Sequence, residues 1–178
     1  DDGGVPLMRN DEVVKRPADP AELTKLYTDE AIDFIEEKKD GPFFLYLPHT
    51  MHHVPLFASD DFRGKSERGL YGDVVEELDW GVGQVLQAFS DTGGEQNTIV
   101  LFTSDNGPTF NGGTDSEFFE STAGLRGLKT SLYEGGIRVP LIVRWPQVVP
   151  PHTVCHTPTS NVDFYPTLLD CTGVKPDP

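Results

Sequence analysis

The sequence predicts an α/β protein: part of a parallel sheet sandwiched by helices. Two observations support this class. Segments with apolar residues every three or four positions alternate with short, wholly apolar runs that prolines or glycines bound, the first pattern being typical of helices and the second of buried strands. The expected order is helix, strand, helix, strand, loop, strand, helix, which favours strands covered by helices. The 178 residues suit a single domain or a part of one, and we treat 1–178 as one unit.

The first helix is expected to follow residues 1–18, which carry no clear periodicity and are interpreted as a loop-like entry segment. Asp19 is a suitable N-cap, Pro20 suits the first helical position, and Glu22 could complete a capping box. Apolar residues then mark one helical face through Lys39: Leu23, Leu26, Tyr27, Ala31, Phe34 and Ile35.

The remaining elements follow from the same two patterns. Apolar runs at 43–47, 98–103 and 139–145 predict three strands, and the second of them is rich in β-branched residues. A long helix is expected over about 71–90, ended by a Gly-Gly pair, and a last short helix is expected to begin at Ser160.

Composition excludes some classes of partner. The chain has 14 Lys and Arg against 29 Asp and Glu, a net charge of −15. Binding to nucleic acid or to anionic lipid requires a basic face, so neither is expected. No apolar run reaches the length of about 18 residues that a membrane span needs. The polar, acidic start of the chain is also unlike a signal peptide, although a processed chain would look the same.

Polar residues follow two predicted strands at their carboxyl ends, where ligands gather in parallel α/β sheets. Asp105 and Asn106 come directly after the second strand and offer hard oxygen ligands that suit Ca²⁺ or Mg²⁺, although two ligands do not fill such a site. The plain alternative is a turn, since Asp-Asn-Gly-Pro is ordinary turn chemistry.

Three histidines, His49, His52 and His53, lie at the end of the first strand. They could bind zinc, act as acid or base, or be surface residues. Lys129, one of few cations, could bind an oxyanion or be simply solvated. Cys155 and Cys171 could pair or remain free, because spacing alone does not decide it.

Five segments in one order resemble the sulfatase family, within the alkaline-phosphatase-like superfamily. The segments are Pro42–Pro48 with His53-Val54-Pro55, Tyr71–Leu86 with Glu77-Leu78-Asp79, Thr98–Pro108 (TIVLFTSDNGP), Leu125–Lys129 (LRGLK) and Tyr133–Pro140 (YEGGIRVP). The resemblance implies that Asp105 and Asn106 bind the active-site cation, usually calcium and less often magnesium. It implies that Lys129 contacts the sulfate and helps to bind the nucleophile, and that His53 binds the sulfate ester and donates a proton to the leaving alcohol.

Family members are much longer than this chain. Their N-terminal part carries two metal-binding aspartates and a Cys- or Ser-x-Pro-Ser-Arg motif, whose first residue becomes the formylglycine nucleophile. Neither cysteine lies in such a motif here, and Asp1-Asp2 follows no apolar strand, so we reject it as the aspartate pair. We therefore expect the middle-to-late part of a sulfatase catalytic domain, inactive on its own, whose partner is the missing N-terminal part.

The resemblance implies hydrolysis of sulfate esters of sugars or aryl alcohols by the intact enzyme, which the family commonly places in the periplasm, outside the cell or in the lysosome. Two alternatives remain. One is a phosphodiester or phosphonate ester hydrolase of the same superfamily, and the other is a non-catalytic binding module.

Overall fold

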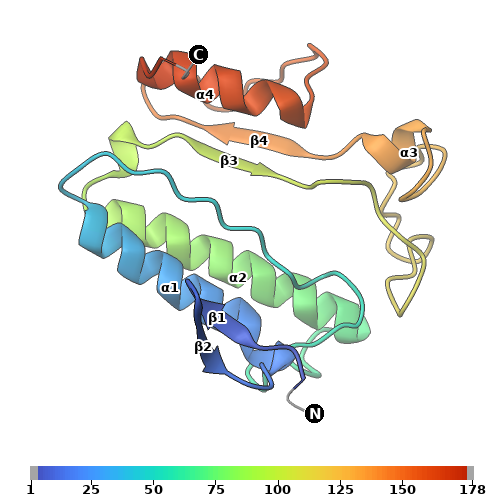
Figure 1. Ribbon diagram of the computed structural model, residues 1–178. Helices are drawn as coiled ribbons and strands as arrows, with labels where there is room; N and C mark the ends of the chain where they lie inside the picture. The colour runs from blue at the N-terminus through green and yellow to red at the C-terminus, as the bar shows by residue number, and fades with distance from the viewer. Residues whose placement is uncertain (1–3, 176–178) are drawn as a thin grey trace.

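The computed structural model describes residues 4–175 and mixes helices with strands, as the α/β class requires (Figure 1). The Asp1-Asp2 pair lies outside the described residues. Two long helices, α1 and α2, run side by side in the same direction and form one layer, and an extended segment together with a strand pair lies over them in Figure 1. The elements are β1 (Leu7–Arg9), β2 (Glu12–Lys15), η1 (Pro20–Glu22), α1 (Leu23–Lys38), α2 (Gly69–Asp91), η2 (Glu95–Asn97), β3 (Val100–Thr103), α3 (Glu134–Ile137), β4 (Leu141–Arg144), η3 (Asn161–Asp163) and α4 (Phe164–Thr172).

The entry segment 1–18 is not the plain loop that we predicted. Strands β1 and β2 pair in an antiparallel hairpin, in which Met8 lies opposite Val13. The two strands are joined at Asn10, which has a left-handed φ of 53° of the kind that asparagine tolerates in tight hairpin turns. The strands are short and mostly exposed, so they lack the apolar alternation that reveals a half-buried strand in a sequence.

The start of α1 follows the predicted capping signal in part. The Asp19 side chain accepts a hydrogen bond from the backbone N–H of Ala21 at 3.0 Å, and Pro20 opens the short η1 turn that leads into the helix. Glu22 does not close a capping box, because its carboxylate binds Lys15 of β2 instead. The helix entrance is therefore tied to the hairpin by an ion pair as well as capped.

Helices α1 and α2 pack against each other where small and hydroxyl side chains meet. Thr28 is fully buried, and its Oγ1 donates to the backbone carbonyl of Thr24 at 2.8 Å. A Cβ built on Gly81 would lie 2.6 Å from that Oγ1. Because Thr28 is held by burial and by its own hydrogen bond, the bare Cα of Gly81 is what allows the two helices to approach here.

Two alanine substitutions in α2 are expected to change stability in opposite directions. Gly83 has open space around its Cα, so Gly83→Ala gains about 1 kcal/mol of unfolding free energy from helix propensity. Gly81→Ala gains the same propensity but forces overpacking against Thr28, at a cost of about 1–3 kcal/mol, so it lowers stability. Urea unfolding of both variants compares them directly. Equal stabilisation by the two would contradict the close contact.

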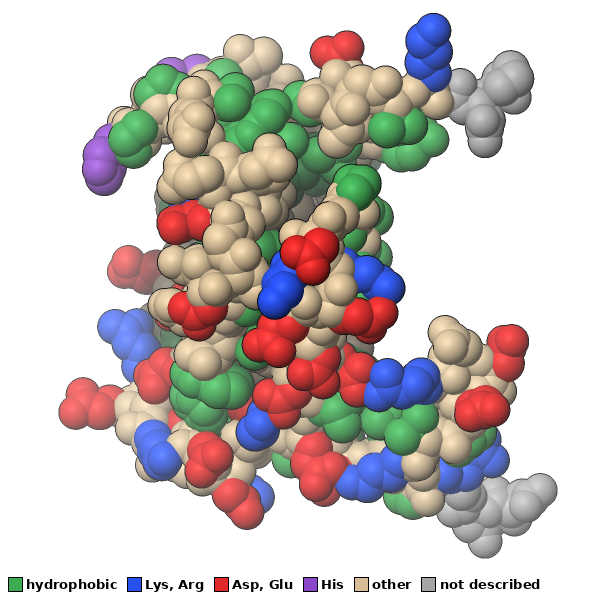
Figure 2. Space-filling view, turned by 90° about the vertical axis from the view of Figure 1, so that its left-hand side faces the viewer, with side chains coloured by type: hydrophobic (Ala, Val, Ile, Leu, Met, Phe, Trp, Pro, Cys, Tyr) green, Lys and Arg blue, Asp and Glu red, His purple; other side chains and the backbone are tan. Residues whose placement is uncertain are grey.

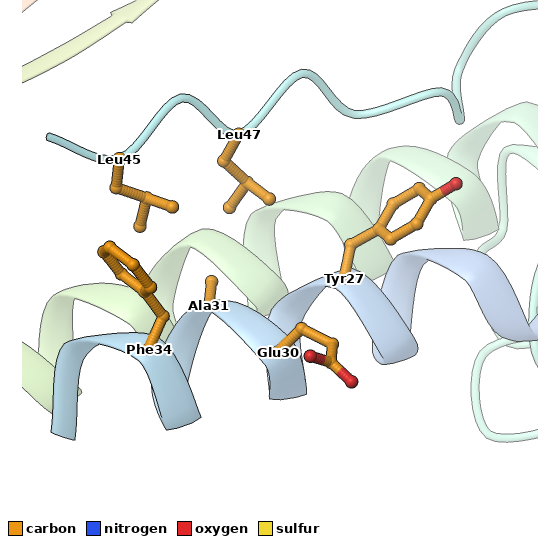
Figure 3. A pocket seen from close by; sticks show the side chains of 6 residues that line it. All are labelled: Tyr27, Glu30, Ala31, Phe34, Leu45 and Leu47. Carbon is orange, nitrogen blue, oxygen red and sulfur yellow. The ribbon is translucent and has the colours of Figure 1, made fainter. Parts of the chain in front are cut away.

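The run Phe43–Leu47 is extended, as predicted, but it is not a strand of a sheet, since its backbone has no backbone hydrogen-bond partner within residues 4–175. Its side chains alternate. Leu45 and Leu47 point toward α1 and line a pocket of about 220 Å³ that Figure 3 shows in close-up, whereas Phe44 and Tyr46 are 73% and 76% exposed. The prediction of burial on both faces is therefore wrong for this structure. The pocket is also lined by residues of α1: Tyr27, Glu30, Ala31 and Phe34.

The second and third predicted strands exist as β3 and β4, and they pair with each other. The pairing is antiparallel, with Leu101 opposite Val143, and not parallel as predicted. The chain between the two strands forms loops and the short α3, and it contains no long crossover helix of the kind that returns a chain to start a parallel strand. Strand β4 is also largely exposed, with Ile142 at 59%.

The core lies between the helix layer and the segments above it. Ile35 of α1 and Phe89 of α2 are buried together, and Phe43, Leu45 and Val100 pack against them. The C-terminal helix begins as predicted, with reciprocal side-chain hydrogen bonds of a capping box between Ser160 and Asp163. On the face seen in Figure 2, acidic side chains interspersed with lysines and arginines lie over the middle and lower parts, and hydrophobic side chains gather on the upper part.

Candidate functional site

His53 and Lys129 are 76 residues apart in the sequence and touch in the structure. The Nζ of Lys129 lies 3.1 Å from the Nε2 of His53. The other ring nitrogen of His53, Nδ1, lies 2.8 Å from the backbone carbonyl oxygen of Val54. A carbonyl oxygen only accepts, so Nδ1 carries a proton and donates to it. The Nε2 lone pair then accepts from the Lys129 ammonium, which fixes both the tautomer and the orientation of the ring.

Asp105 and Asn106 form the turn directly after β3. The Nδ2 of Asn106 donates to Oδ1 of Asp105, and the Ser104 hydroxyl donates to the backbone carbonyl of Asn106 at 3.1 Å. The Oδ1 of Asn106 is buried and has no hydrogen-bond partner among the described residues. A buried amide oxygen without a donor is costly unless something binds it, and a hard cation is the kind of group that such an oxygen prefers.

Backbone hydrogen bonds join the Asp105-Asn106 turn to the loop of Lys129. The N–H of Lys129 donates to the carbonyl of Pro108 at 2.8 Å, and the N–H of Gly107 donates to the carbonyl of Gly136 at 2.9 Å. The approach is so close that a Cβ built on Gly107 would lie 2.0 Å from the carbonyl oxygen of Gly135. The missing side chain of Gly107 therefore allows the turn and the lysine loop to be held together as one unit.

The two arginines near Lys129 are engaged elsewhere. The guanidinium of Arg126 lies 3.6 Å from the ring centroid of Tyr133, in a cation–π contact. Arg138, at the end of α3, pairs with Glu134 one turn earlier, at 3.4 Å. These interactions hold both guanidinium groups on other side chains. The positive charge in contact with His53 is the ammonium of Lys129.

The other two histidines do not join this pair in any hydrogen bond between described residues. His52 is exposed, and His49 has both ring nitrogens buried without a partner among the described residues. Burial lowers the pKa of His49 below its ordinary value, and the nearby charge of His52 lowers it further. Residues 4–175 contain no group of three or more His, Cys, Asp and Glu that could hold a metal, so the three histidines do not form the zinc site considered above. Cys155 and Cys171 are both free and exposed.

Two buried carboxylates on α2 support the loop that follows His53, and we did not predict their role. Asp73 is 2% exposed and accepts hydrogen bonds from the backbone N–H groups of Gly64 (2.8 Å), Lys65 (3.1 Å) and Ser66 (2.7 Å). Glu77 is 1% exposed and accepts from the N–H of Ser59 at 2.9 Å. The available signal was their spacing of four, which places both acids on the same side of α2 as buried Gly81.

Comparisons with known proteins agree on one family. The family model described as Sulfatase matches residues 7–174. The chain is 40% identical over 169 residues to human steryl-sulfatase, covering 94% of this chain and 29% of that protein. It is also 40% identical over 170 residues to N-acetylgalactosamine-6-sulfatase of Mus musculus, covering 92% of this chain and 31% of that protein.

Solved structures give the same result. A crystal structure of Ps i-CgsB in complex with k-i-k-neocarrahexaose superposes with a TM-score of 0.84 at 32% identity, covering 97% of this chain and 38% of that chain. A Bacteroides thetaiotaomicron protein from a glycosaminoglycan metabolism locus (BT33336S-sulf) gives a TM-score of 0.80 at 36% identity, covering 90% of this chain and 34% of that chain. The chain thus spans less than two fifths of the length of these relatives, and both the sequence and the fold show that it belongs to the sulfatase family.

Proposed function

We propose that the enzyme of which this chain is a part hydrolyses sulfuric esters. The observation that carries the proposal is the contact between His53 Nε2 and Lys129 Nζ, made next to the backbone bond that joins the Lys129 loop to the Asp105-Asn106 turn. An imidazole, an ammonium and a pair of hard oxygen ligands on neighbouring loops are the groups that binding and cleaving an anionic ester require.

Lys129 and His53 are proposed to act directly on the ester. The Lys129 ammonium binds the sulfate oxygens and offsets the negative charge that they carry as the ester bond breaks. In this structure Nε2 of His53 has no proton of its own, because it accepts from Lys129. When the ester binds, the Lys129 ammonium turns to the sulfate oxygens and Nε2 of the exposed His53 takes up a proton from water. The resulting Nε2–H then gives this proton to the leaving alcohol oxygen. Lys129 thus aims the ring before the substrate binds and holds the sulfate afterwards.

Asp105 and Asn106 are proposed to hold part of a divalent cation site. The buried, unpartnered Oδ1 of Asn106 and the carboxylate of Asp105 fit a hard cation, and Ca²⁺ is preferred over Mg²⁺ by the resemblance. Ca²⁺ takes six to eight oxygen ligands, so two residues are an incomplete set. When bound, such a cation polarises a sulfate oxygen and supplies positive charge. The further ligands and the formylglycine nucleophile are proposed to come from other parts of the enzyme.

The proposed partner of this chain is the N-terminal part of the same catalytic domain. The backbone of Phe43–Leu47 has no backbone hydrogen-bond partner in the described part of the chain, and the side chains of Phe44 and Tyr46 are exposed. Both observations support this proposal, because a contact with another segment would pair the backbone and bury the rings. The chain alone is then expected to be inactive. None of the helices within residues 4–175 is long and apolar enough to cross a membrane. A periplasmic, extracellular or lysosomal location is proposed by family resemblance.

The proposed substrate is a sulfated sugar or an aryl sulfate. Relatives named for steryl, aryl and N-acetylgalactosamine sulfates are equally similar, so the family permits either class. A phosphodiester or phosphonate ester is the alternative within the superfamily, since the nucleophile that separates the two chemistries is not in this chain. A purely binding role is less well supported, because His53, Lys129, Asp105 and Asn106 are all present and hydrogen-bonded into neighbouring loops.

The experiment is a comparison of two esters with the complete enzyme. We expect hydrolysis of 4-nitrophenyl sulfate to exceed hydrolysis of bis(4-nitrophenyl) phosphate, and a calcium chelator to abolish it. His53→Ala is expected to lower kcat by about 10²–10⁴-fold, the range for loss of a general acid. His52→Ala is the matched control, because it removes an exposed neighbouring imidazole with no such contact. Preference for the phosphodiester would favour the alternative chemistry.

A further inference from the structure

The loop that follows the Asp105-Asn106 turn touches the chain next to His53. A Cβ built on Gly112 would lie 2.4 Å from Cγ1 and 2.8 Å from Cβ of Val54. Real Cβ atoms do not approach other carbons so closely, so only a glycine fits unless one of the two segments moves. Gly112 also has a φ of +66°, a conformation that glycine adopts without strain.

The Gly112 side of this contact is held in place. Thr114 is 3% exposed, and its hydroxyl donates to the carbonyls of Thr109 at 2.8 Å and Asn111 at 2.7 Å. Further along the loop, the ring of Phe119 packs edge-on against Tyr71 of α2, with centroids 4.8 Å apart. Buried hydrogen bonds close to Gly112 and an aromatic contact beyond it thus oppose a displacement of the loop away from Val54.

The Val54 side of the contact leads directly to His53. The carbonyl oxygen of Val54 is the acceptor for His53 Nδ1–H. Met51 and Leu56, on either side of this pair in the sequence, are buried in one cluster, and Val54 packs against it. The chain from 51 to 56 is therefore anchored at both ends with His53 between them. A displacement of Val54 therefore moves the carbonyl oxygen that orients the imidazole of His53. The Nε2 atom of the ring then shifts relative to Lys129 Nζ.

We infer that Gly112 is a positioning residue for His53: its missing side chain lets the loop buttress Val54, whose carbonyl holds the imidazole toward Lys129. The inference rests on the proposed function only for the role of His53. The contact and its effect on the ring stand on geometry alone, so they can be tested without turnover.

The first test reads the His53 ring by nitrogen NMR of the complete enzyme with ¹⁵N-labelled histidine. In the unchanged enzyme we expect the proton on Nδ1, where it bonds the carbonyl of Val54. Gly112→Ala is expected to shift the signals toward the tautomer mixture of a free imidazole, as the bonds to Val54 and Lys129 are lost. Gly113→Ala is the matched control: its φ is +93°, but its Cβ would meet only Leu56 Cδ1, at 3.7 Å. It carries similar backbone strain without the collision, so we expect the His53 signals to stay in place.

The second test is rescue. Val54→Ala removes the atoms with which the new methyl collides, so Gly112→Ala combined with Val54→Ala is expected to restore the His53 signals. This double variant also keeps the test decisive if Gly112→Ala alone fails to fold. Unchanged His53 signals in Gly112→Ala would overturn the inference. An equal shift of the His53 signals in Gly113→Ala would also overturn it, and so would His53 signals that stay displaced in the double variant.

In the complete enzyme the same substitution is expected to lower kcat by about 10²-fold with little change in KM, the cost of a misplaced catalytic group. The NMR measurement and the kinetic measurement together distinguish a failure of the positioning role from a failure of the proposed function. An enzyme without any sulfatase activity whose Gly112→Ala variant shows displaced His53 signals would reject the proposed function and keep the positioning role. An active enzyme in which Gly112→Ala changes neither the signals nor kcat would reject the positioning role alone.

Discussion

Replacing Lys129 with Met in the complete enzyme is expected to lower kcat for an aryl sulfate by about 10²–10³-fold, the usual cost of removing one preorganised charge-stabilising donor. Two losses contribute. The sulfate oxygens lose the ammonium that offsets their charge, and Nε2 of His53 loses the donor that aims it. The fold is expected to survive, because the backbone N–H of Lys129, and not its side chain, makes the bond to Pro108. Steady-state kinetics measures the loss of kcat, and the midpoint of thermal unfolding shows whether the fold is retained.

The control for this substitution is Lys25→Met. Lys25 lies on α1, where its ammonium pairs with Asp29 one turn along the exposed face. It removes the same charge from the same acidic protein without touching the proposed site, and exposed pairs of this kind contribute little to stability. A loss of activity in Lys129→Met no greater than that in Lys25→Met would show that Lys129 only contributes to the overall charge.

Replacing Asp73 with Ala is expected to lower the free energy of unfolding by about 2–4 kcal/mol, more than any other substitution proposed here. Its buried carboxylate receives three backbone hydrogen bonds from Gly64, Lys65 and Ser66, and hydrogen bonds to a charged group are worth about 1.5–3 kcal/mol each before partial replacement by water. Urea unfolding of Asp73→Ala beside Glu76→Ala, an exposed acid on the same helix, measures the difference. Equal stability of the two variants would mean that water replaces the carboxylate without cost.

The same carboxylate makes stability depend on pH. Burial disfavours the charged form and acts to raise the pKa of Asp73, but the hydrogen bonds from Ser66, Gly64 and Lys65 outweigh burial, and the pKa lies below its ordinary value. A depressed folded-state pKa stabilises the protein above the unfolded-state value of about 3.9, and this contribution is lost as pH falls through the lower folded value. We expect Asp73→Asn to weaken the loss of stability below about pH 4. If the free energy of unfolding of Asp73→Asn falls below about pH 4 as steeply as that of the unchanged protein, this account of Asp73 is contradicted.

Local patterns in the sequence were sufficient to predict helices α1, α2 and α4, but not the short α3, and they marked the candidate site residues without choosing between a site and a plain loop. The caps at Asp19 and Ser160 and the three-four spacing of α2 are properties of neighbouring residues, and so is the Asp-Asn-Gly-Pro turn after β3. Motif resemblance then predicted that His53 and Lys129 lie together, and the structure brings them into contact.

Contacts between distant segments could not be predicted in the same way. Pairing of β3 with β4 is set by which strands come together in space, and an apolar run does not encode its direction. The contact of Gly112 with Val54 has no signature in either segment, since a glycine in a loop usually marks a turn. Asp73 and Glu77 look like the solvated acids of any acidic helix until burial shows otherwise.

The most direct measurement is a crystal structure of the complete catalytic domain with bound Ca²⁺ and sulfate, in which anomalous scattering locates the calcium. We expect the calcium to be bonded to oxygens of Asp105 and Asn106 at about 2.3–2.6 Å, with sulfate oxygens in hydrogen-bond contact with Lys129 Nζ and His53 Nε2. Calcium bound without either of these oxygens, or sulfate bound away from both Lys129 and His53, would contradict the proposed site.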